Sequence, residues 1–345
     1  MISYAKTSRT QPRLKDFIKF FLFFLIAVLL VVLAFRGVSI KTIITQIYKA
    51  KFVWVFFSFF ISAVALVSRA YRWNLLLEPL GYKPPLQKTF YSLMTGYLAN
   101  LAFPRLGEVT RCGSLSKAES IPFDELLGTV IVERVIDVLS LLVCILITTI
   151  IEFKRLGNFL RSGILDPILH KLRVVLSFPI IIVAIVILIV FAFLFFQYLN
   201  KKKNKKQGKN KIANLVKGIV AGIVSVRKLK RPWAFVFHSV FIWLLYYLSV
   251  YVALFALPST SNLDLGAALF LLVAGGLGMS APVQGGIGAY HLLVSQGLVL
   301  YGLTQQDGLA FATLLHGLQI VLIVLLGSIS LLLLFLQRNR KTDAA

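Results

Sequence analysis

Three charged residues, Glu133, Arg134 and Asp137, interrupt the apolar stretch Leu126–Ile151. Charged side chains inside a membrane segment are costly, so they are candidates for function. Glu133 and Asp137 are four positions apart and share one face of a helix, and Arg134 lies about 100° around it. We expect the two carboxylates to face a polar cavity, as acceptors of protons or cations or as partners of basic residues. The alternative is a structural lock in which Arg134 neutralises one carboxylate.

A second group of residues suited to phosphate chemistry surrounds a proline. Pro104 ends the preceding helix, and Gly107 allows close backbone approach. Arg105 and Arg111 offer planar donor forks that match phosphate, and Glu108 would hold one of them in place. We therefore expect Arg105 and Arg111 to receive a phosphate group, and we expect the removal of Arg105 or Glu108 to abolish transport.

Two further arginines, Arg69 and Arg72, end another apolar run and precede Trp73. They are candidates for the same site, together with Asn100, which interrupts an apolar stretch later in the chain. The alternative for Arg69 and Arg72 is the ordinary anchoring of a span end at the membrane interface.

A glycine-rich segment forms the last candidate group. Successive backbone N–H groups in such a turn can bind an anion ahead of a helix N-terminus, and the alternative is a close helix crossing. The histidine that follows could titrate near neutrality, or it is a core residue with its hydrogen bonds satisfied. The residues in question are Gln284, Gly285, Gly286, Gly288 and His291. No Gly-Lys-Ser/Thr is present, so this is not a P-loop.

The composition decides the class of element that must position these residues. The chain has 345 residues, of which 58% are hydrophobic and 14% are charged, against about 25% charged residues in soluble domains. Long unbroken apolar runs exclude a transmembrane β-barrel. The net charge of +24 is typical of cytoplasmic loops facing anionic lipid, so no nucleic-acid partner is expected. Two cysteines predict neither a disulfide framework nor a thiolate metal site.

A spanning helix needs about 20 apolar residues. Six stretches meet this condition: Phe17–Phe35, which reads as a retained anchor, Phe52–Ser68, Leu126–Ile151, Val174–Leu199, Phe235–Leu257 and Leu309–Leu336. Two others, Leu86–Phe103 and Leu265–Tyr301, are broken by polar residues, glycine or proline.

Charge decides the topology. The segment Asn200–Arg231 contains twelve Lys and Arg and no acid, which places it in the cytoplasm with the basic N-terminal arm and C-terminal tail. Both termini share that side only if each broken stretch enters and returns without crossing. The alternative is that Pro and Gly merely kink ordinary helices.

We therefore predict an all-α polytopic membrane protein with about six full spans and two re-entrant helical hairpins. The parts are a cytoplasmic arm (1–16), a first half (17–199) with its hairpin near 86–103, a basic linker (200–231), a second half (232–336) with its hairpin near 265–301, and a tail (337–345). The linker carries an amphipathic pattern suited to anionic lipid. Hairpins entering from opposite faces resemble an inverted repeat, whose broken elements mark the substrate site in transporters.

Four motifs then identify a resemblance. They are Arg69-Ala-Tyr-Arg72-Trp73, Asn100 to Arg111, Glu133-Arg134-Val-Ile-Asp137 and Pro282-x-x-Gly285-Gly286-Ile287-Gly288. In this order the chain resembles, over about 17–336, the transmembrane region of lysylphosphatidylglycerol synthases, the flippase domain of the multiple peptide resistance factor. It is also similar to stand-alone bacterial and archaeal relatives linked to lipid or polyprenyl-glycan translocation. Many relatives carry an acidic residue where this chain has His291.

The resemblance implies a lipid translocase that moves a phosphate-bearing lipid between the leaflets of the cell inner membrane, without a cofactor. The chain has no soluble aminoacyl-transferase domain, so the resemblance implies no synthase activity and no other enzymatic one. Two alternatives stay open: an ion- or proton-coupled transporter of small solutes, and a non-catalytic partner that presents lipid to a separate transferase. A homo-oligomer is compatible with the sequence.

Overall fold

The computed structural model describes residue 25 and residues 28–37, 39–153, 155 and 228–343. Over these residues the regular structure is entirely helical. Several predictions lie outside the described residues: the N-terminal arm, the span Val174–Leu199, most of the first span, and nearly all of the basic linker with its amphipathic pattern.

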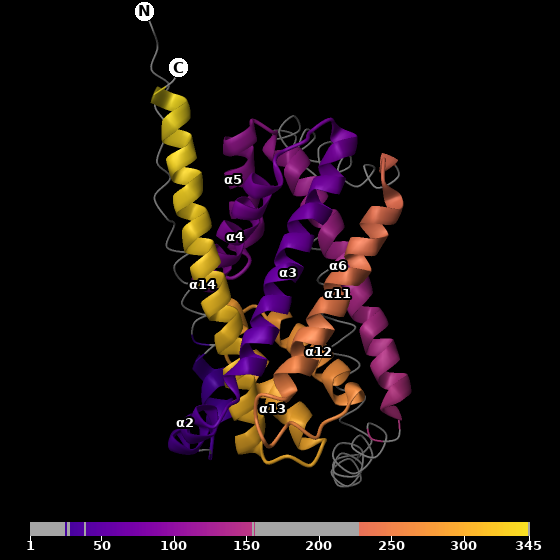
Figure 1. Cartoon of the computed structure of the whole chain (residues 1–345), viewed down its shortest axis with the longest axis vertical. Helices are drawn as coiled ribbons and strands as arrows, with labels where there is room; N and C mark the ends of the chain where they lie inside the picture. The colour runs from indigo at the N-terminus through magenta and orange to yellow at the C-terminus, as the bar shows by residue number, and fades with distance from the viewer. Residues whose placement is uncertain (1–24, 26–27, 38, 154, 156–227, 344–345) are drawn as a thin grey trace, which may run out of the picture.

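Four long helices extend from one end of the molecule to the other (Figure 1). They are α3 (Phe52–Leu77), α6 (Phe123–Ile151), α11 (Pro232–Leu254) and α14 (Gln305–Asp343). By length and composition, three segments of the described chain could cross a membrane: Phe52–Leu80, Pro232–Leu254 and Gln305–Gln337. Helix α6 has 29 residues and is therefore about 43 Å long, with its charged residues in its first half.

The predicted span Phe52–Ser68 is too short, because α3 continues to Leu77. The prediction ended at the first arginine, whereas the structure pairs Arg69 and Arg72 with carboxylates and so lets the helix continue. Residues 36–51, which connect the first two predicted spans, contain helix α2 (Ile40–Tyr48). Its isoleucines recur at helical spacing, and Ile43 and Ile47 belong to the core formed with the second half of the chain.

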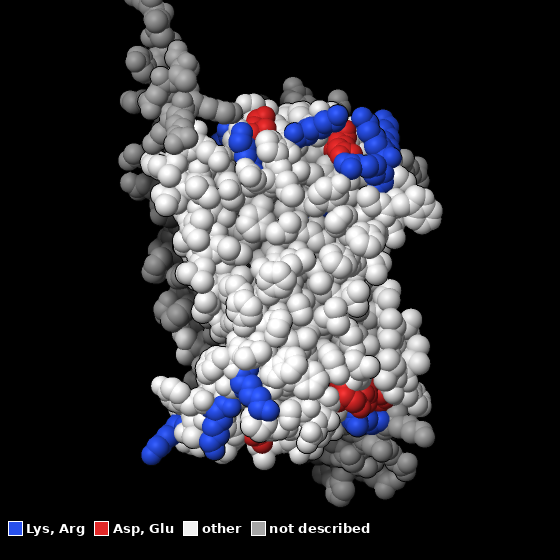
Figure 2. All heavy atoms as spheres, viewed as in Figure 1, with Lys and Arg blue, Asp and Glu red and all other residues white. Residues whose placement is uncertain are grey.

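The exterior of the molecule is apolar between its two ends. Only 17% of the most apolar window of α14 is buried, and 28% and 33% of the windows in the α3 and α11 segments. On the face shown in Figure 2, lysines, arginines and acidic residues gather at both ends, with an uncharged band between them. Such a band is typical of a surface that faces the hydrocarbon of a membrane, since soluble proteins rarely expose so large an apolar patch.

The first hairpin consists of α4 (Leu86–Ala102) and α5 (Leu106–Glu119). The prediction that the hairpin lies within 86–103 is wrong, because the polar residues and glycine of this stretch do not break α4, and the return arm is α5. Both helices lie in the same half of the molecule, so the chain returns to the end from which it came (Figure 1). Glycines allow the close approach: a Cβ on Gly96 would lie 2.7 Å from the carbonyl oxygen of Gly107. With 17 and 14 residues, each helix is shorter than the roughly 20 residues of a span.

The second hairpin consists of α12 (Leu265–Ser280), the short 3₁₀ turn η4 (Gln284–Gly286) and α13 (Ala289–Val299). It lies in the opposite half of the molecule (Figure 1). Asp264 caps α12, since its Oδ1 accepts a hydrogen bond from the Ala267 N–H at 2.8 Å.

The tips of the two hairpins meet. A Cβ on Gly285, in the second hairpin, would lie 3.0 Å from Leu101 Cδ2, near the tip of the first. Helix α14 packs against both α4 and α13 and spans the junction. One helical hairpin from each end, in contact near the middle, is the arrangement that positions the candidate site.

Candidate functional site

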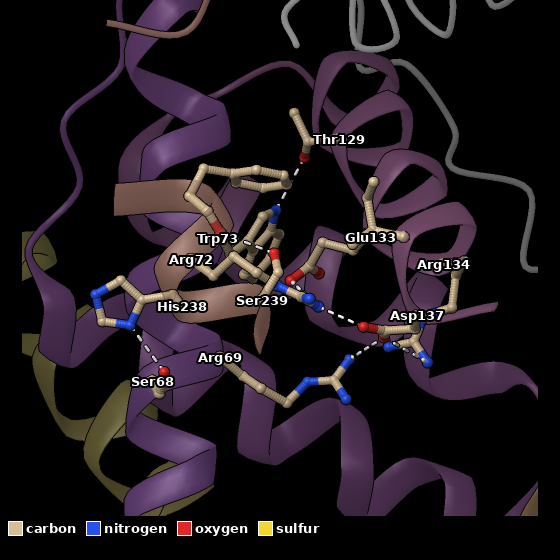
Figure 3. A network of polar contacts seen from close by, with 12 residues as sticks. Ser68, Arg69, Arg72, Trp73, Thr129, Glu133, Arg134, Asp137, His238 and Ser239 are labelled. Atoms are coloured by element: carbon tan, nitrogen blue, oxygen red, sulfur yellow. Dashed lines mark hydrogen bonds and ion pairs between the residues drawn. The ribbon is translucent and has the colours of Figure 1, made fainter. Parts of the chain in front are cut away.

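Helices α3 and α6 bring arginines and carboxylates together. Arg69 and Arg72 are three positions apart and project from one face of α3, as Glu133 and Asp137 do from α6. Arg69 Nη2 lies 2.8 Å from Asp137 Oδ2, and Arg72 Nη2 lies 2.7 Å from Asp137 Oδ1. Figure 3 shows both guanidinium groups pointing at this carboxylate. Asp137 is therefore held between two arginines.

The first hairpin completes the cluster through α5. Arg111 Nη1 lies 2.7 Å from Glu133 Oε2, and Arg72 Nη2 lies 3.4 Å from Glu133 Oε1. The side chains of Arg72 and Glu133 are fully buried, and those of Arg111, Arg69 and Asp137 are 3%, 7% and 14% exposed. We refer to these five residues as the arginine cluster. Charges so far from water are stabilised only by one another and by the dipoles around them.

Aromatic and hydroxyl side chains hold the arginines in place. Trp73 Nε1 donates a hydrogen bond to Thr129 Oγ1 at 2.9 Å, and Arg111 Cζ lies 4.9 Å from the centre of the Trp73 ring. Arg69 Nη1 donates a hydrogen bond to the Tyr246 hydroxyl at 3.1 Å. Ring faces attract cations and hydroxyls accept from them, so both contacts orient the guanidinium groups without neutralising their charge.

A pocket adjoins the cluster where α4, α5 and α6 converge. It is small: the space in it that is open to a water molecule is about 10 Å³, which holds about one water. Its lining comprises Leu93, Gly96, Tyr97, Asn100, Gly107, Glu108, Arg111 and Arg134. The pocket thus connects the buried cluster, through Arg111, with the partly exposed pair Glu108 and Arg134.

Several arginine nitrogens have no protein partner within the described part of the chain. Arg72 Nη1, Arg111 Nη2 and the Nε atoms of Arg69 and Arg72 are buried and make neither a hydrogen bond nor an ion pair there. Buried donors are normally satisfied. Guanidinium donors without a protein partner, close to a pocket, are typical of an anion-binding site.

The structure brings most of the predicted site residues together. Arg69, Arg72, Arg111, Glu133 and Asp137 form the cluster, while Asn100, Glu108 and Arg134 line the pocket beside it. The Oδ1 atom of Asn100 accepts a hydrogen bond from the Gly107 N–H at 2.6 Å, which fixes the hairpin next to the pocket.

One alternative drawn from the sequence is wrong: Arg69 and Arg72 are not interface anchors, because they are buried against Asp137. The other, in which Arg134 neutralises a carboxylate, is met in part. Arg134 Nη1 forms an ion pair with Asp137 Oδ2 at 3.8 Å, but its side chain is 41% exposed. Arg69 and Arg72 approach Asp137 more closely. The other acidic neighbour of Arg134, Glu108, is 3.9 Å away.

Arg105 lies apart from the cluster. It is exposed at the tip of the first hairpin, where its φ of 63° makes the turn into α5. Six residues separate it from Arg111, which is about 9 Å along a helix. Arg105 is not among the residues that line the pocket, and the expectation that both arginines bind one phosphate stays a prediction.

The glycine-rich residues form the tip of the second hairpin. Gly285, Gly286 and Gly288 have positive φ angles of 55°, 76° and 84°, which glycine adopts readily. His316 Nε2 is 2.9 Å from the carbonyl oxygen of Gly285, and the His291 ring centre is 5.0 Å from that of His316.

Both amide atoms of Gln284 are buried and unpartnered among the described residues. None of the predicted residues of this segment lines the pocket. The structure therefore places them across the tip contact, in a second, separate polar region.

The sequence reasoning missed Tyr246, Thr129 and the contact between His316 and Gly285. Tyr246 lies 177 positions from Arg69, inside an apolar run that gives no sign of a cation nearby. Thr129 is four positions before Glu133 on the same helical face, and this spacing was the available signal for it.

Over the described residues the chain is helical, with an apolar exterior (Figure 2) around buried charges, which is the pattern of an integral membrane protein. The chain belongs to the lysylphosphatidylglycerol synthase transmembrane region family, whose sequence model matches residues 20–327. It is also similar to a UPF0104 membrane protein of Methanocaldococcus jannaschii, with 30% identity over 112 residues, 32% of this chain and 33% of the relative. The match thus spans about a third of that relative's length. No solved structure matches the chain.

Proposed function

We propose that this protein moves a phosphate-bearing lipid between the leaflets of the cell inner membrane, and that it acts as a transporter rather than an enzyme. The observation that supports this most directly is the arginine cluster, which presents one buried donor, Arg111 Nη2, without a partner among the described residues, to a pocket. A lipid headgroup is the polar group that reaches a site inside the membrane while its acyl chains stay in hydrocarbon. Membership of the family agrees with this proposal.

The two hairpins are re-entrant in this proposal, within a fold of about six full spans. Their helices are shorter than a span, and each hairpin returns to its own end of the molecule. Non-helical backbone at membrane depth, such as the two tips, is tolerated where protein or a wet cavity surrounds it. The paired tips then lie on the route of the headgroup, as broken elements do in other transporters.

The orientation follows from the basic linker. Arg231, its last residue, forms an ion pair with Glu78 in the turn between α3 and α4. The linker therefore ends at the face from which the first hairpin descends. Because twelve Lys and Arg mark the linker as cytoplasmic, we assign this face and both termini to the cytoplasm. Anionic lipid headgroups are the natural neighbours of the linker.

The headgroup phosphate would widen the pocket and accept hydrogen bonds from Arg111, whose Nη2 has no partner among the described residues. The barrier to flipping is the transfer of a charged group into hydrocarbon, and paired, oriented guanidinium groups lower it by replacing water. Arg105 lies about 9 Å further along α5, at the hairpin tip, and would meet the phosphate on its way past the second hairpin. No cofactor and no nucleic acid takes part in these steps.

The test is lipid flipping in proteoliposomes. A fluorescent phosphatidylglycerol is reconstituted with the protein, and access of a quencher reports the fraction in each leaflet. Arg111→Gln, which removes the pocket's buried cation, is expected to slow flipping at least tenfold. Arg105→Gln is expected to slow it as well.

Lys88→Gln is the matched control, because Lys88 pairs with Glu119 near the membrane face and away from the pocket. Flipping at the wild-type rate by both arginine variants would contradict the proposal. Uptake of a soluble solute without any flipping would favour the small-solute transporter. Activity only in the presence of a co-purified transferase would favour the lipid-presenting partner.

A further inference from the structure

The charges of the arginine cluster do not balance. Three arginines, Arg69, Arg72 and Arg111, share two carboxylates, Glu133 and Asp137. The cluster therefore carries one net positive charge with almost no access to water. An uncompensated buried charge is strongly destabilising, and arginine does not lose its proton in proteins.

The surrounding residues do not remove this excess. Among the described residues the other polar neighbours of the arginines, Tyr97, Tyr246, Trp73 and Thr129, are neutral. The partly exposed Arg134 and Glu108 at the pocket contribute one charge of each sign. Cluster and pocket together thus carry a single positive charge.

The excess charge is accessible from the pocket at one point. Of the three cluster arginines only Arg111 lines the pocket. Its side chain is 3% exposed, its Nη1 is engaged by Glu133, and its Nη2 has no partner among the described residues. A ligand in the pocket can therefore reach the unbalanced charge through this guanidinium group.

We propose that the pocket selects a headgroup with a single negative charge, a phosphodiester, over both zwitterionic and multiply anionic headgroups. This inference rests on the proposed function and narrows its substrate. A phosphodiester brings the site to neutrality. An ammonium group on the headgroup restores the positive excess, and a phosphomonoester or pyrophosphate adds negative charge that the site does not match. Each mismatch leaves a net charge at a depth where charge is costly.

The experiment compares three fluorescent lipids that differ only in headgroup. Phosphatidylglycerol carries one negative charge, phosphatidylethanolamine is zwitterionic, and phosphatidic acid carries a monoester phosphate, of about −1.5 to −2 at neutral pH. We expect the wild-type protein in proteoliposomes to flip phosphatidylglycerol at least tenfold faster than either of the others.

Two variants at the pocket rim shift the net charge without disturbing the buried pairs. The sequence alone predicted that removal of Glu108 abolishes transport, but in the structure this carboxylate lies outside the buried ion pairs, 3.9 Å from the partly exposed Arg134. We therefore expect Glu108→Gln to raise the net charge by one, so that phosphatidic acid is flipped faster than by the wild type and phosphatidylglycerol more slowly. Arg134→Gln lowers it by one, and the preference for phosphatidylglycerol over phosphatidylethanolamine should fall. The side chains of Glu108 and Arg134 are 29% and 41% exposed, so both variants are expected to fold.

The two possible failures are distinguishable. If the wild type flips all three lipids at one rate, and Arg111→Gln abolishes it, the charge rule is wrong and the proposed function stands. If no lipid is flipped, the proposed function itself fails. The last measurement tests uptake of soluble dimethyl phosphate into vesicles. Uptake without lipid flipping would mean that the pocket prefers a single negative charge but carries a soluble phosphodiester, and it would overturn the lipid proposal.

Discussion

Because arginines outnumber carboxylates in the cluster, removing a carboxylate should cost more stability than removing an arginine. Asp137 receives Arg69 at 2.8 Å and Arg72 at 2.7 Å. Asp137→Asn keeps the shape of the side chain, removes the charge between these arginines and raises the buried excess from one positive charge to two. Arg72→Gln acts in the opposite direction, because it leaves Arg69 with Asp137 and Arg111 with Glu133, and the cluster becomes neutral.

The magnitudes follow from the burial of these groups. Removing one partner of a buried ion pair costs about 3–5 kcal/mol, and Asp137 is 14% exposed, so Asp137→Asn should lose an amount in that range. Arg72→Gln loses contacts of a fully buried side chain but relieves the excess charge. It should therefore cost at least about 1.4 kcal/mol less, a factor of ten in the unfolding equilibrium constant.

The assay is equilibrium unfolding in detergent micelles, followed by helical circular dichroism. Asp124→Asn is the matched control: it removes a carboxylate from the first turn of the same helix, where only the helix dipole is affected and about 0.3–1 kcal/mol is at stake. A loss for Asp137→Asn no greater than that of the control would refute the reasoning. An Arg72→Gln variant less stable than Asp137→Asn would show that packing, and not net charge, governs the cluster.

Three further variants test the framework around the site. Gly96→Ala, whose Cβ would lie 2.7 Å from the Gly107 carbonyl oxygen, should lower the thermal unfolding temperature and slow lipid flipping, while Gly113→Ala, with open space around its Cβ, should do neither. Gly285→Ala should slow flipping more than Gly302→Ala in the same proteoliposome assay. Both glycines have positive φ, but of the two only Gly285 has a neighbour across the tip contact. Equal effects would show that backbone strain alone slows flipping. Trp73→Phe loses the hydrogen bond to Thr129 and weakens the cation–π contact with Arg111. It should lower the free energy of unfolding in detergent by about 1 kcal/mol, and an unchanged stability would contradict this role of Trp73.

The sequence predicted the helical class and the second hairpin because these depend on local features. Apolar run length identifies the long helices, and glycine and proline identify the break at 281–288. The prediction places the first hairpin too early, within 86–103, because it assigns the break to polar residues inside α4. The opposite entry of the hairpins followed from the positive charge of the linker and the termini, which is a property of whole segments. These features can be recognised in the sequence without knowing any tertiary contact.

Which charges pair with which could not be predicted, because pairing is a property of three helices together. Spacing placed Glu133 and Asp137 on one face of α6, but nothing in the spacing shows that α3 presents Arg69 and Arg72 to that face. The same limit explains the placement of Arg105. It is close to Arg111 in sequence, yet the turn at the hairpin tip carries it away from the pocket.

The depth of the cluster constrains how a headgroup can move. Arg69 lies eight residues before the end of α3, about 12 Å from the face where the first hairpin begins and about 7 Å from the middle of this 26-residue helix, so the cluster lies between that face and the middle of the molecule. Beyond it, the contact between Leu101 and Gly285 stands between the pocket and the polar residues of the second hairpin. In the proposed transport, a headgroup at Arg111 would enter from one leaflet and would need this contact to open before it reaches the other. We therefore expect separation of the hairpin tips to limit the rate of flipping, and Gly285 to matter for flipping although it lies outside the pocket.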